Sequence, residues 1–283
     1  MEVHDAVVIG AGPAGLTAAI YLARFRRRVL VLGDIPSRAS WIPESHNTPG
    51  FPHGVGGTEL LARLTAQARE FGVEIREARV EGLALAREGF EVSGRNVGLK
   101  ASTVLLATGV IDRMPDLPGI EAAVRRSLVR MCPICDAYEA TDKRIAVLGD
   151  GGLAEREAAF LRAYSDDLTV IGTGEGALSF IGDTVEWRGS GDEAPRAFDH
   201  LYLALGCEPQ SALAAACGAR RDDDGNLLVD AHQMTSVDGL YAAGDVVRGL
   251  NQIAVATGQA AVAATAIHNR LRTAAEHLRQ ARG

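Results

Sequence analysis

The sequence lacks a long apolar run and an excess of positive charge. None of its 283 residues fall in a run of eighteen apolar residues, so no membrane span is expected. Lys and Arg number 29 against 36 Asp and Glu, and the net charge of −7 disfavours nucleic acid or an anionic membrane as the main partner. Residues 1–5 lack the basic start of a secretion signal. These features together predict a cytoplasmic protein.

Cysteine is also scarce, which limits its possible uses. The sequence has four cysteines, and residues 132–136 read Cys-Pro-Ile-Cys-Asp. A C-x-x-C pair is redox-active, half of a zinc site, a structural disulfide or a chance occurrence, and zinc needs a second ligand pair. Cys207 and Cys217 lie ten residues apart, without His or Cys at ligand spacing. We therefore predict no metal site and favour a redox-active pair, as expected for a reducing compartment.

The N-terminal segment carries a dinucleotide-binding pattern. A buried strand is expected over residues 6–9, a helix over 16–25 and a second strand over 29–32, with Gly-Ala-Gly-Pro-Ala-Gly at 10–15 between the first two. The glycines allow a tight turn, close approach of a pyrophosphate and close helix packing, and the helix N-terminus attracts phosphate. An acid at the end of the second strand would hold a ribose. The candidate residues are Gly10, Gly12, Pro13, Ala14, Gly15 and Asp34.

Two later segments favour FAD over NAD as the ligand of this first site. Residues 103–109 read Thr-Val-Leu-Leu-Ala-Thr-Gly, a buried strand that ends in a turn at Thr108 and Gly109. Residues 240–246 read Leu-Tyr-Ala-Ala-Gly-Asp-Val. There Gly244 would allow close backbone approach, and Asp245 would accept a hydrogen bond from a ribityl hydroxyl of the flavin.

Several segments together resemble one protein family. Residues 47–52 read Asn-Thr-Pro-Gly-Phe-Pro, 57–60 read Gly-Thr-Glu-Leu, and 251–261 contain Asn-Gln-Ile-Ala and Ala-Thr-Gly-Gln-Ala-Ala. With Cys-x-x-Cys-Asp between two dinucleotide motifs, the chain resembles the low-molecular-weight thioredoxin reductases, which are FAD-dependent disulfide oxidoreductases. The resemblance covers nearly the whole chain. It implies that Asn47, Gln252 and Ile253 lie at the flavin and that the protein is a homodimer.

The resemblance also implies roles for the redox motif. FAD would pass two electrons to the Cys132–Cys135 disulfide, with Cys135 as the thiol that contacts the flavin. Cys132 would attack the disulfide of a partner, either a thioredoxin-like dithiol protein or a small disulfide, and Asp136 would be the general acid. For Arg130 we expect a solvated side chain in preference to a thiolate partner.

The second glycine motif departs from the family. A strand is expected over 144–148, then the G-x-G-x-x-A pattern at 149–154, a helix over 155–162 and a strand over 168–171. Family members that use NADPH continue with His-Arg-Arg, whereas residues 172–177 read Gly-Thr-Gly-Glu-Gly-Ala and no Lys or Arg occurs between Arg162 and Arg188. A 2′-phosphate would lack a charge partner, and Glu175 is the sole candidate for an NADH ribose.

We therefore predict a relative that does not use a pyridine nucleotide and receives electrons from ferredoxin or through a second FAD. NAD(P)H binding by an atypical loop remains the alternative. A redox-sensing flavoprotein without substantial turnover, and an oxidase that handles oxygen or peroxide, are further hypotheses.

The predicted fold class is α/β, with two Rossmann-like three-layer dinucleotide-binding domains, the second inserted in the first and shortened. Residues 1–113 and 207–283 would form the FAD-binding domain, and 114–206 a reduced pyridine-nucleotide-type domain that carries the C-x-x-C. Residues 113–119 and 206–209 are the expected linkers. Residues 172–197 leave little room for a full meander and helix, with a single candidate strand at 184–187.

Overall fold

The computed structural model describes residues 2–34, 36–191 and 194–280, and the chain divides into two compact units. The outer unit comprises Met1–Ser40, Thr58–Ile111 and Pro209–Gly283, and the inserted unit comprises Trp41–Gly57 and Asp112–Glu208. The insertion of one unit within the other agrees with the predicted fold class. Residues 41–57 group with the inserted unit, which the domain limits expected from the sequence did not anticipate.

The sheet of the outer unit has a parallel half and an antiparallel half. Its strand order is β3-β2-β1-β6-β5-β4, and β16 also pairs with β6. The long strand β6 makes this possible, because residues 97–101 pair with β5 and residues 104–106 pair with β16. The strands are β1 (Glu2–Ile9), β2 (Val29–Gly33), β3 (Glu74–Glu77), β4 (Val80–Leu85), β5 (Phe90–Gly94), β6 (Val97–Leu106) and β16 (Leu240–Ala242).

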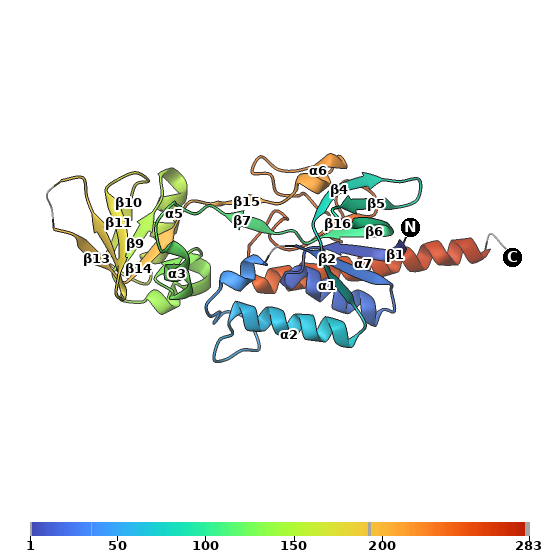
Figure 1. Ribbon diagram of the computed structural model, residues 1–283, viewed down its shortest axis with the longest axis horizontal. Helices are drawn as coiled ribbons and strands as arrows, with labels where there is room; N and C mark the ends of the chain where they lie inside the picture. Colours follow the sequence, from blue (N-terminus) through green and yellow to red (C-terminus); the bar gives the residue numbers. More distant parts are fainter. Residues whose placement is uncertain (1, 35, 192–193, 281–283) are drawn as a thin grey trace. The chain divides into compact units, whose positions relative to one another are not determined.

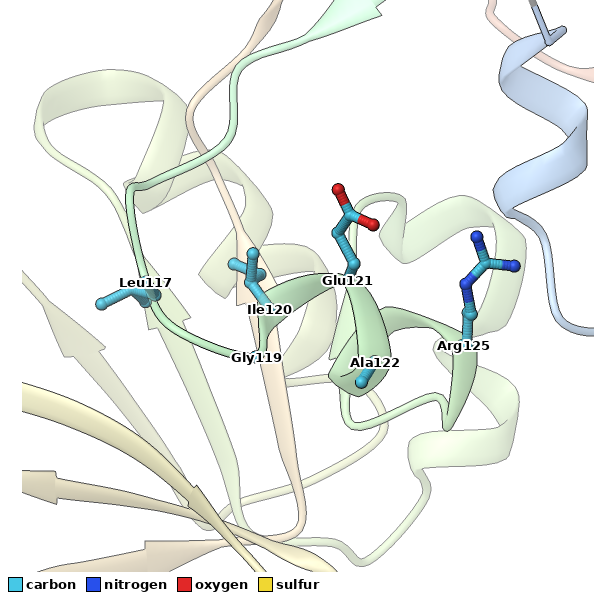
Figure 2. A pocket seen from close by; sticks show the side chains of 6 residues that line it. All are labelled: Leu117, Gly119, Ile120, Glu121, Ala122 and Arg125. Carbon is cyan, nitrogen blue, oxygen red and sulfur yellow. The ribbon is translucent and has the colours of Figure 1, made fainter.

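A separate apolar core lies on each face of this sheet, and helices cover one of these faces (Figure 1). Helices α1 (Pro13–Arg24), α2 (Gly57–Glu70) and α7 (Ile253–Gln280) lie on one face, where small side chains such as Ala18 and Ala260 are fully buried and allow α1 and α7 to pack closely. On the other face, Leu30 and Leu106 pack with Phe90 and with the short helix α6 (Ala212–Ala216).

The inserted unit repeats this plan on a smaller scale. Its four-stranded parallel sheet has the order β10-β9-β14-β8, and a three-stranded antiparallel sheet of β11, β12 and β13 packs with α3 on one face. Helices α4 and α5 and the 3-10 turn η2 cover the other face. The strands and helices are α3 (Ile120–Arg125), β8 (Val129–Arg130), α4 (Pro133–Asp136), η2 (Tyr138–Ala140), β9 (Ile145–Leu148), α5 (Gly151–Leu161), β10 (Leu168–Ile171), β11 (Ala177–Ile181), β12 (Thr184–Arg188), β13 (Arg196–Phe198) and β14 (His200–Leu203).

One expectation about this unit was wrong. Three strands, β11 to β13, fit into the stretch for which a single strand was expected. They fit because tight turns connect them: Gly174 and Gly176 before β11, and Gly182 between β11 and β12, adopt positive φ angles of +86°, +68° and +55°. Within the described residues, no helix lies between β10 and β14. The missing crossover helix is what shortens the unit.

The two connections between the units pair with each other. Strand β7 (Val110–Asp112) forms a two-stranded sheet with β15 (Cys207–Pro209). The backbone N–H of Arg113 donates to the carbonyl of Gly206, and that of Gln210 donates to the carbonyl of Gly109. The remaining short element is the 3-10 turn η1 (Arg38–Trp41). In the described part of the chain, no helix combines the length and the apolar character needed to cross a membrane.

Candidate active site and cofactor site

A disulfide joins the two cysteines of the C-x-x-C motif. Cys132 is the N-cap of α4 and Pro133 its first helical residue, where a missing N–H costs nothing. The single helical turn brings the Cα atoms of Cys132 and Cys135 to 5.3 Å, and the N–H of Cys135 donates to the carbonyl of Cys132 at 3.0 Å. The predicted pair is thus placed for reversible closure of a small ring.

The residue after the second cysteine, Asp136, lies in a polar cluster. Its Oδ2 is 3.0 Å from Nη1 of Arg130, and its Oδ1 accepts a hydrogen bond of 2.9 Å from the hydroxyl of Tyr202. Arg130 and Tyr202 are paired residues of the neighbouring parallel strands β8 and β14, so the sheet presents both to the same carboxyl group. The expectation of a solvated Arg130 was wrong, since its side chain is 9% exposed.

Burial and charge act in opposite directions on Asp136. Burial raises the pKa of its carboxyl group above the usual value, and the Arg130 guanidinium and the Tyr202 hydroxyl pull that pKa down. Burial, together with the nearby Asp136, raises the pKa of Tyr202, so the phenol keeps its proton and remains a donor. A raised pKa leaves more of the Asp136 carboxyl group protonated, and so able to donate a proton, than in an exposed aspartate.

Sequence reasoning missed Tyr202. The residue is fully buried in β14 among apolar neighbours. The available signal was the residue type itself, because a tyrosine in a strand buried on both faces needs a hydrogen-bond partner for its hydroxyl. Asp136 could not be chosen as that partner from the sequence, since the two residues are 66 positions apart.

The surface next to the disulfide includes apolar side chains. Ile134, between the two cysteines, is 50% exposed, and Tyr138 is 78% exposed, so Tyr138 has no core role. Asn47 belongs to the same compact unit, and its Nδ2 donates to the carbonyl of Ile134 at 3.4 Å. The predicted contact of Asn47 with the flavin stays a prediction.

The first glycine turn lies at the end of β1 in the outer unit. Gly10 has φ of +115°, and a Cβ there would lie 2.1 Å from the carbonyl oxygen of Ala107; a Cβ on Gly15 would lie 1.9 Å from the carbonyl oxygen of Gly10. Gly12 caps α1 without any side-chain hydrogen bond, Pro13 follows, and the first turn of α1 contains no acid. The N–H groups of that turn are therefore placed for an anionic group such as a pyrophosphate.

Other predicted cofactor residues lie beside this turn in the same unit. A Cβ on Gly244, where φ is +81°, would lie 3.0 Å from Cβ of Ala14. Asp245 is 3.2 Å from Nη1 of Arg38. Asp34 follows β2 and its Oδ2 is 3.6 Å from Nη1 of Arg79. The close backbone at Gly244 and the open helix N-terminus fit a dinucleotide.

Four further residues predicted to bind the cofactor lie in the same unit. The hydroxyl of Thr108 donates to the carbonyl of Gln210 at 2.6 Å, and Gly109 has φ of +64°. Gln252 and Ile253 lie at the start of α7, whose first residue is Ile253. Thr108 thus fixes the turn after β6, and α7 begins within a few residues of Asp245 in the sequence. All of these residues belong to the outer unit.

The second glycine turn, after β9, differs in its polar contacts. Asp150 caps α5, and its carboxylate accepts hydrogen bonds from the backbone N–H of Thr173, at 3.0 Å, and from the Thr173 hydroxyl. Oε2 of Glu175 accepts the N–H of Gly172 at 3.2 Å. The loop after β10 is thereby tied to the glycine turn and to itself by two carboxylates. No positive side chain accompanies them over residues 163–187.

Comparison with known proteins shows the family of the whole chain. The family model described as pyridine nucleotide-disulphide oxidoreductase matches residues 4–188 and 176–260. The chain belongs to this family. It is 30% identical over 278 residues to the thioredoxin reductase of Mycolicibacterium smegmatis, covering 87% of this chain and 89% of that protein. It is also 30% identical to the bifunctional thioredoxin reductase/thioredoxin of Mycobacterium leprae, over 93% of this chain and 64% of the length of that protein.

Solved structures give the same assignment for this family member. The thioredoxin reductase of Streptococcus pyogenes superposes with a TM-score of 0.88 at 25% identity, over 96% of this chain and 99% of that one. The crystal structure of HlmI superposes with a TM-score of 0.85 at 29% identity, over 98% and 96%. The predicted resemblance is confirmed: the chain is a thioredoxin-reductase-like flavin disulfide oxidoreductase, and membership of this family implies FAD.

Proposed function

We propose that the protein passes electrons between FAD and the Cys132–Cys135 pair, and on to a partner disulfide, without NADPH as donor. FAD would be held by the first glycine turn, with Asp34 and Asp245 as acceptors for its ribose and ribityl hydroxyls. Bound FAD would supply the electron pair that opens the Cys132–Cys135 disulfide. Cys132, Cys135 and Asp136 would then carry out the exchange with the partner.

Thiol–disulfide exchange uses three side chains of the inserted unit. The thiolate of Cys132 attacks one sulfur of the partner disulfide, which forms a mixed disulfide and expels the other sulfur with the bonding electron pair. That leaving thiolate takes the proton of the Asp136 carboxyl group. The thiolate of Cys135 then attacks Cys132, which restores the disulfide and releases the second partner thiolate. The exposed Ile134 leaves room beside the motif for a partner.

The proposal that NADPH is not the electron donor rests on the carboxylates at the second glycine turn. A nicotinamide dinucleotide would place its pyrophosphate at the N-terminus of α5 and its adenosine ribose at the end of β10. Asp150 and Glu175 stand at those two places, and both are exposed carboxylates hydrogen-bonded to the loop itself. Binding would bring phosphate charges close to these like charges, and a 2′-phosphate would meet no arginine on residues 172–177. The positive side chain at the turn itself is Arg156, whose Nη1 would lie 3.2 Å from a Cβ on Gly152.

The donor and partner follow from this proposal. Ferredoxin, or a second FAD bound in the inserted unit, would replace the nicotinamide, and the acceptor would be a thioredoxin-like dithiol protein or a small disulfide. The likeness to thioredoxin reductases supports this class of acceptor. We further propose that the protein acts as a cytoplasmic homodimer.

The thiol route is tested by anaerobic reduction of the flavin with dithiothreitol. The wild-type protein should contain bound FAD, and its flavin absorbance should bleach as dithiothreitol electrons pass through Cys132 and Cys135. Cys132→Ser and Cys135→Ser should keep FAD and lose at least a hundredfold of the bleaching rate, whereas Cys217→Ser, outside the motif, serves as the matched control. Equal rates in all four proteins would rule out the thiol route.

A further inference from the structure

The contacts of the Asp136 carboxyl group identify two side chains that control it. We propose that Tyr202 is a positioning residue for thiol–disulfide exchange: with Arg130, it orients the Asp136 carboxyl group and stabilises the carboxylate that remains once the proton has left. The inference rests on the proposed function, in which Asp136 is the proton donor. It assigns a role to a buried hydroxyl that lies outside the C-x-x-C motif.

The geometry divides the two carboxylate oxygens between two donors. Oδ1 of Asp136 accepts from the Tyr202 hydroxyl at 2.9 Å, and Oδ2 lies 3.0 Å from Nη1 of Arg130. The same two donors also reach the backbone carbonyl of Asp136, at 3.2 Å and 3.4 Å. Since Tyr202 and Arg130 are register partners on β14 and β8, the orientation of Asp136 is set by the sheet and not by the short helix α4 alone.

Because Tyr202 and Arg130 are buried, their polar groups need partners within the protein. Tyr202 is fully buried, and the side chain of Arg130 is 9% exposed. A buried phenol needs a hydrogen-bond partner, and a buried guanidinium needs a counter-ion. Nε of Arg130 has no partner among the described residues, so the charge of this arginine is compensated through its Nη1 contact with Asp136. Asp136 is therefore the counter-ion of Arg130 in its carboxylate form, the form that remains once the proton has left.

Tyr202 is one of the two donors to the Asp136 carboxyl group, beside Arg130, and other titratable groups nearby affect the charge of the cluster. Glu139, on η2, raises the pKa of Asp136 as burial does, and Arg130 lowers it. His200, on β14, has its pKa lowered to about 4 by burial and by Arg130, so it is neutral at the pH of an assay. The phenol of Tyr202 stays protonated, because burial raises its pKa. Loss of its hydrogen bond should therefore make Asp136 a weaker acid.

The test compares two disulfides that differ in their need for a proton. An aliphatic disulfide such as 2-hydroxyethyl disulfide expels a basic thiolate, whereas the aromatic dithiobis(nitrobenzoate) expels a weakly basic thiolate that leaves unaided. The FAD-bound protein is reduced anaerobically and mixed with either compound in a single turnover at a series of pH values. The variants are Tyr202→Phe and, as a matched control in the same unit, Tyr164→Phe, whose ring packs against Phe160.

With the aliphatic disulfide, the pH at which the rate falls on the alkaline side should rise by about one unit in Tyr202→Phe, because a hydrogen bond to a charged group is lost. With the aromatic disulfide the profile should not change, and Tyr164→Phe should match the wild type with both. Arg130→Gln should shift the aliphatic profile in the same direction and further; it is the second variant if Tyr202→Phe does not retain FAD.

Three results would count against the inference. Unchanged aliphatic profiles in Tyr202→Phe and Arg130→Gln would overturn the role of these residues. Equal shifts with the aromatic disulfide would show that the thiols, and not Asp136, had been altered. A wild-type protein that reacts with neither disulfide would instead overturn the proposed function, so the two failures are distinguishable.

Discussion

The two glycine turns of this chain share a sequence motif but differ in backbone and in polar contacts, since the positive φ angle falls at Gly10 in the first and at Gly151 in the second. The first, after β1, leads into a helix whose first turn has no acid and whose cap is glycine. The second, after β9, is capped by Asp150, whose carboxylate is hydrogen-bonded to Thr173. A glycine motif therefore indicates the fold of a dinucleotide domain. The charge and hydrogen bonding of the side chains around the helix N-terminus determine whether a phosphate group binds there.

The largest expected effect breaks the first turn and spares the second. Gly10→Ala would place a Cβ 2.1 Å from a backbone oxygen at φ of +115°, whereas Gly151→Ala, at φ of +61°, would meet nothing within 4 Å. The Gly10→Ala protein should not retain FAD. Its free energy of unfolding should fall by about 3 kcal/mol or more, because the added Cβ causes overpacking and backbone strain. Gly151→Ala should keep FAD and lose about 1 kcal/mol. The ratio of FAD to protein chain measures cofactor retention in the two variants, and thermal unfolding measures their stability. Equal loss of FAD in both variants would contradict the difference proposed between the two turns.

A second experiment separates the chemistry of the inserted unit from the cofactor of the outer unit. Cys135→Ser should abolish reduction of a partner thioredoxin while FAD stays bound at the wild-type ratio, since Cys135 lies outside the outer unit. Activity is measured by the appearance of free thiols on thioredoxin with chemically reduced flavin. Loss of FAD in this variant would contradict the role given to Cys135.

The third experiment converts the second turn toward the first. Asp150→Gly combined with Glu175→Arg removes one carboxylate and reverses the charge of the other. Each exposed charge contact is worth about 1 kcal/mol at most, so the affinity for 2′,5′-ADP should rise about tenfold. Calorimetric titration measures it, with Asp166→Asn as the control for a general change of charge. An unchanged affinity for 2′,5′-ADP would mean that the carboxylates of Asp150 and Glu175 do not prevent nucleotide binding.

The smallest expected effect concerns stability. Burial raises the pKa of Glu157, on α5, to about 7, and its Oε2 is buried without a partner among the described residues. The folded form then binds this proton more tightly than the unfolded chain, so the contribution of Glu157 to stability falls as pH rises from about 4.5 to about 7. Glu157→Gln should stabilise the protein by about 1–2 kcal/mol at pH 8 and by little at pH 4.5.

Hydrogen exchange of the α5 amides at the two pH values measures this difference within the inserted unit. The outer unit provides the internal reference, because its amides should respond equally in the two proteins. If the wild-type protein and Glu157→Gln protect the α5 amides equally at each of the two pH values, the assigned burial of Glu157 is contradicted.

The sequence allowed the layered fold to be predicted because its signals were local. Alternating strand and helix patterns around two glycine turns located β1, α1, β2, β9 and β10 to within a few residues. The C-x-x-C spacing likewise predicted the pairing of Cys132 with Cys135. Within the meander over residues 177–198, the strand predicted at 184–187 is β12, whereas β11 and β13 were missed. Both are short and partly exposed, which weakens the apolar alternation on which strand prediction depends.

The polar surroundings of the active site could not be predicted, because they arise from long-range pairing. Arg130 and Tyr202 become neighbours when β8 pairs with β14, and only then do both reach Asp136. The internal hydrogen bonds of the second turn depend in the same way on Thr173 meeting Asp150, 23 residues earlier. The missing arginines and both carboxylates were visible in the sequence, but the hydrogen bonds of Asp150 and Glu175 to the loop after β10 were not.

The central claim is that the inserted unit keeps thiol chemistry without a nicotinamide donor. The most direct measurement is an anaerobic titration of the FAD-bound protein with NADPH and then NADH, followed by dithiothreitol, with the flavin absorbance recorded after each addition. We predict no bleaching by either nucleotide and full bleaching by dithiothreitol. Rapid bleaching by NADPH or NADH would contradict the account and would make the protein a pyridine-nucleotide-dependent enzyme with an atypical site.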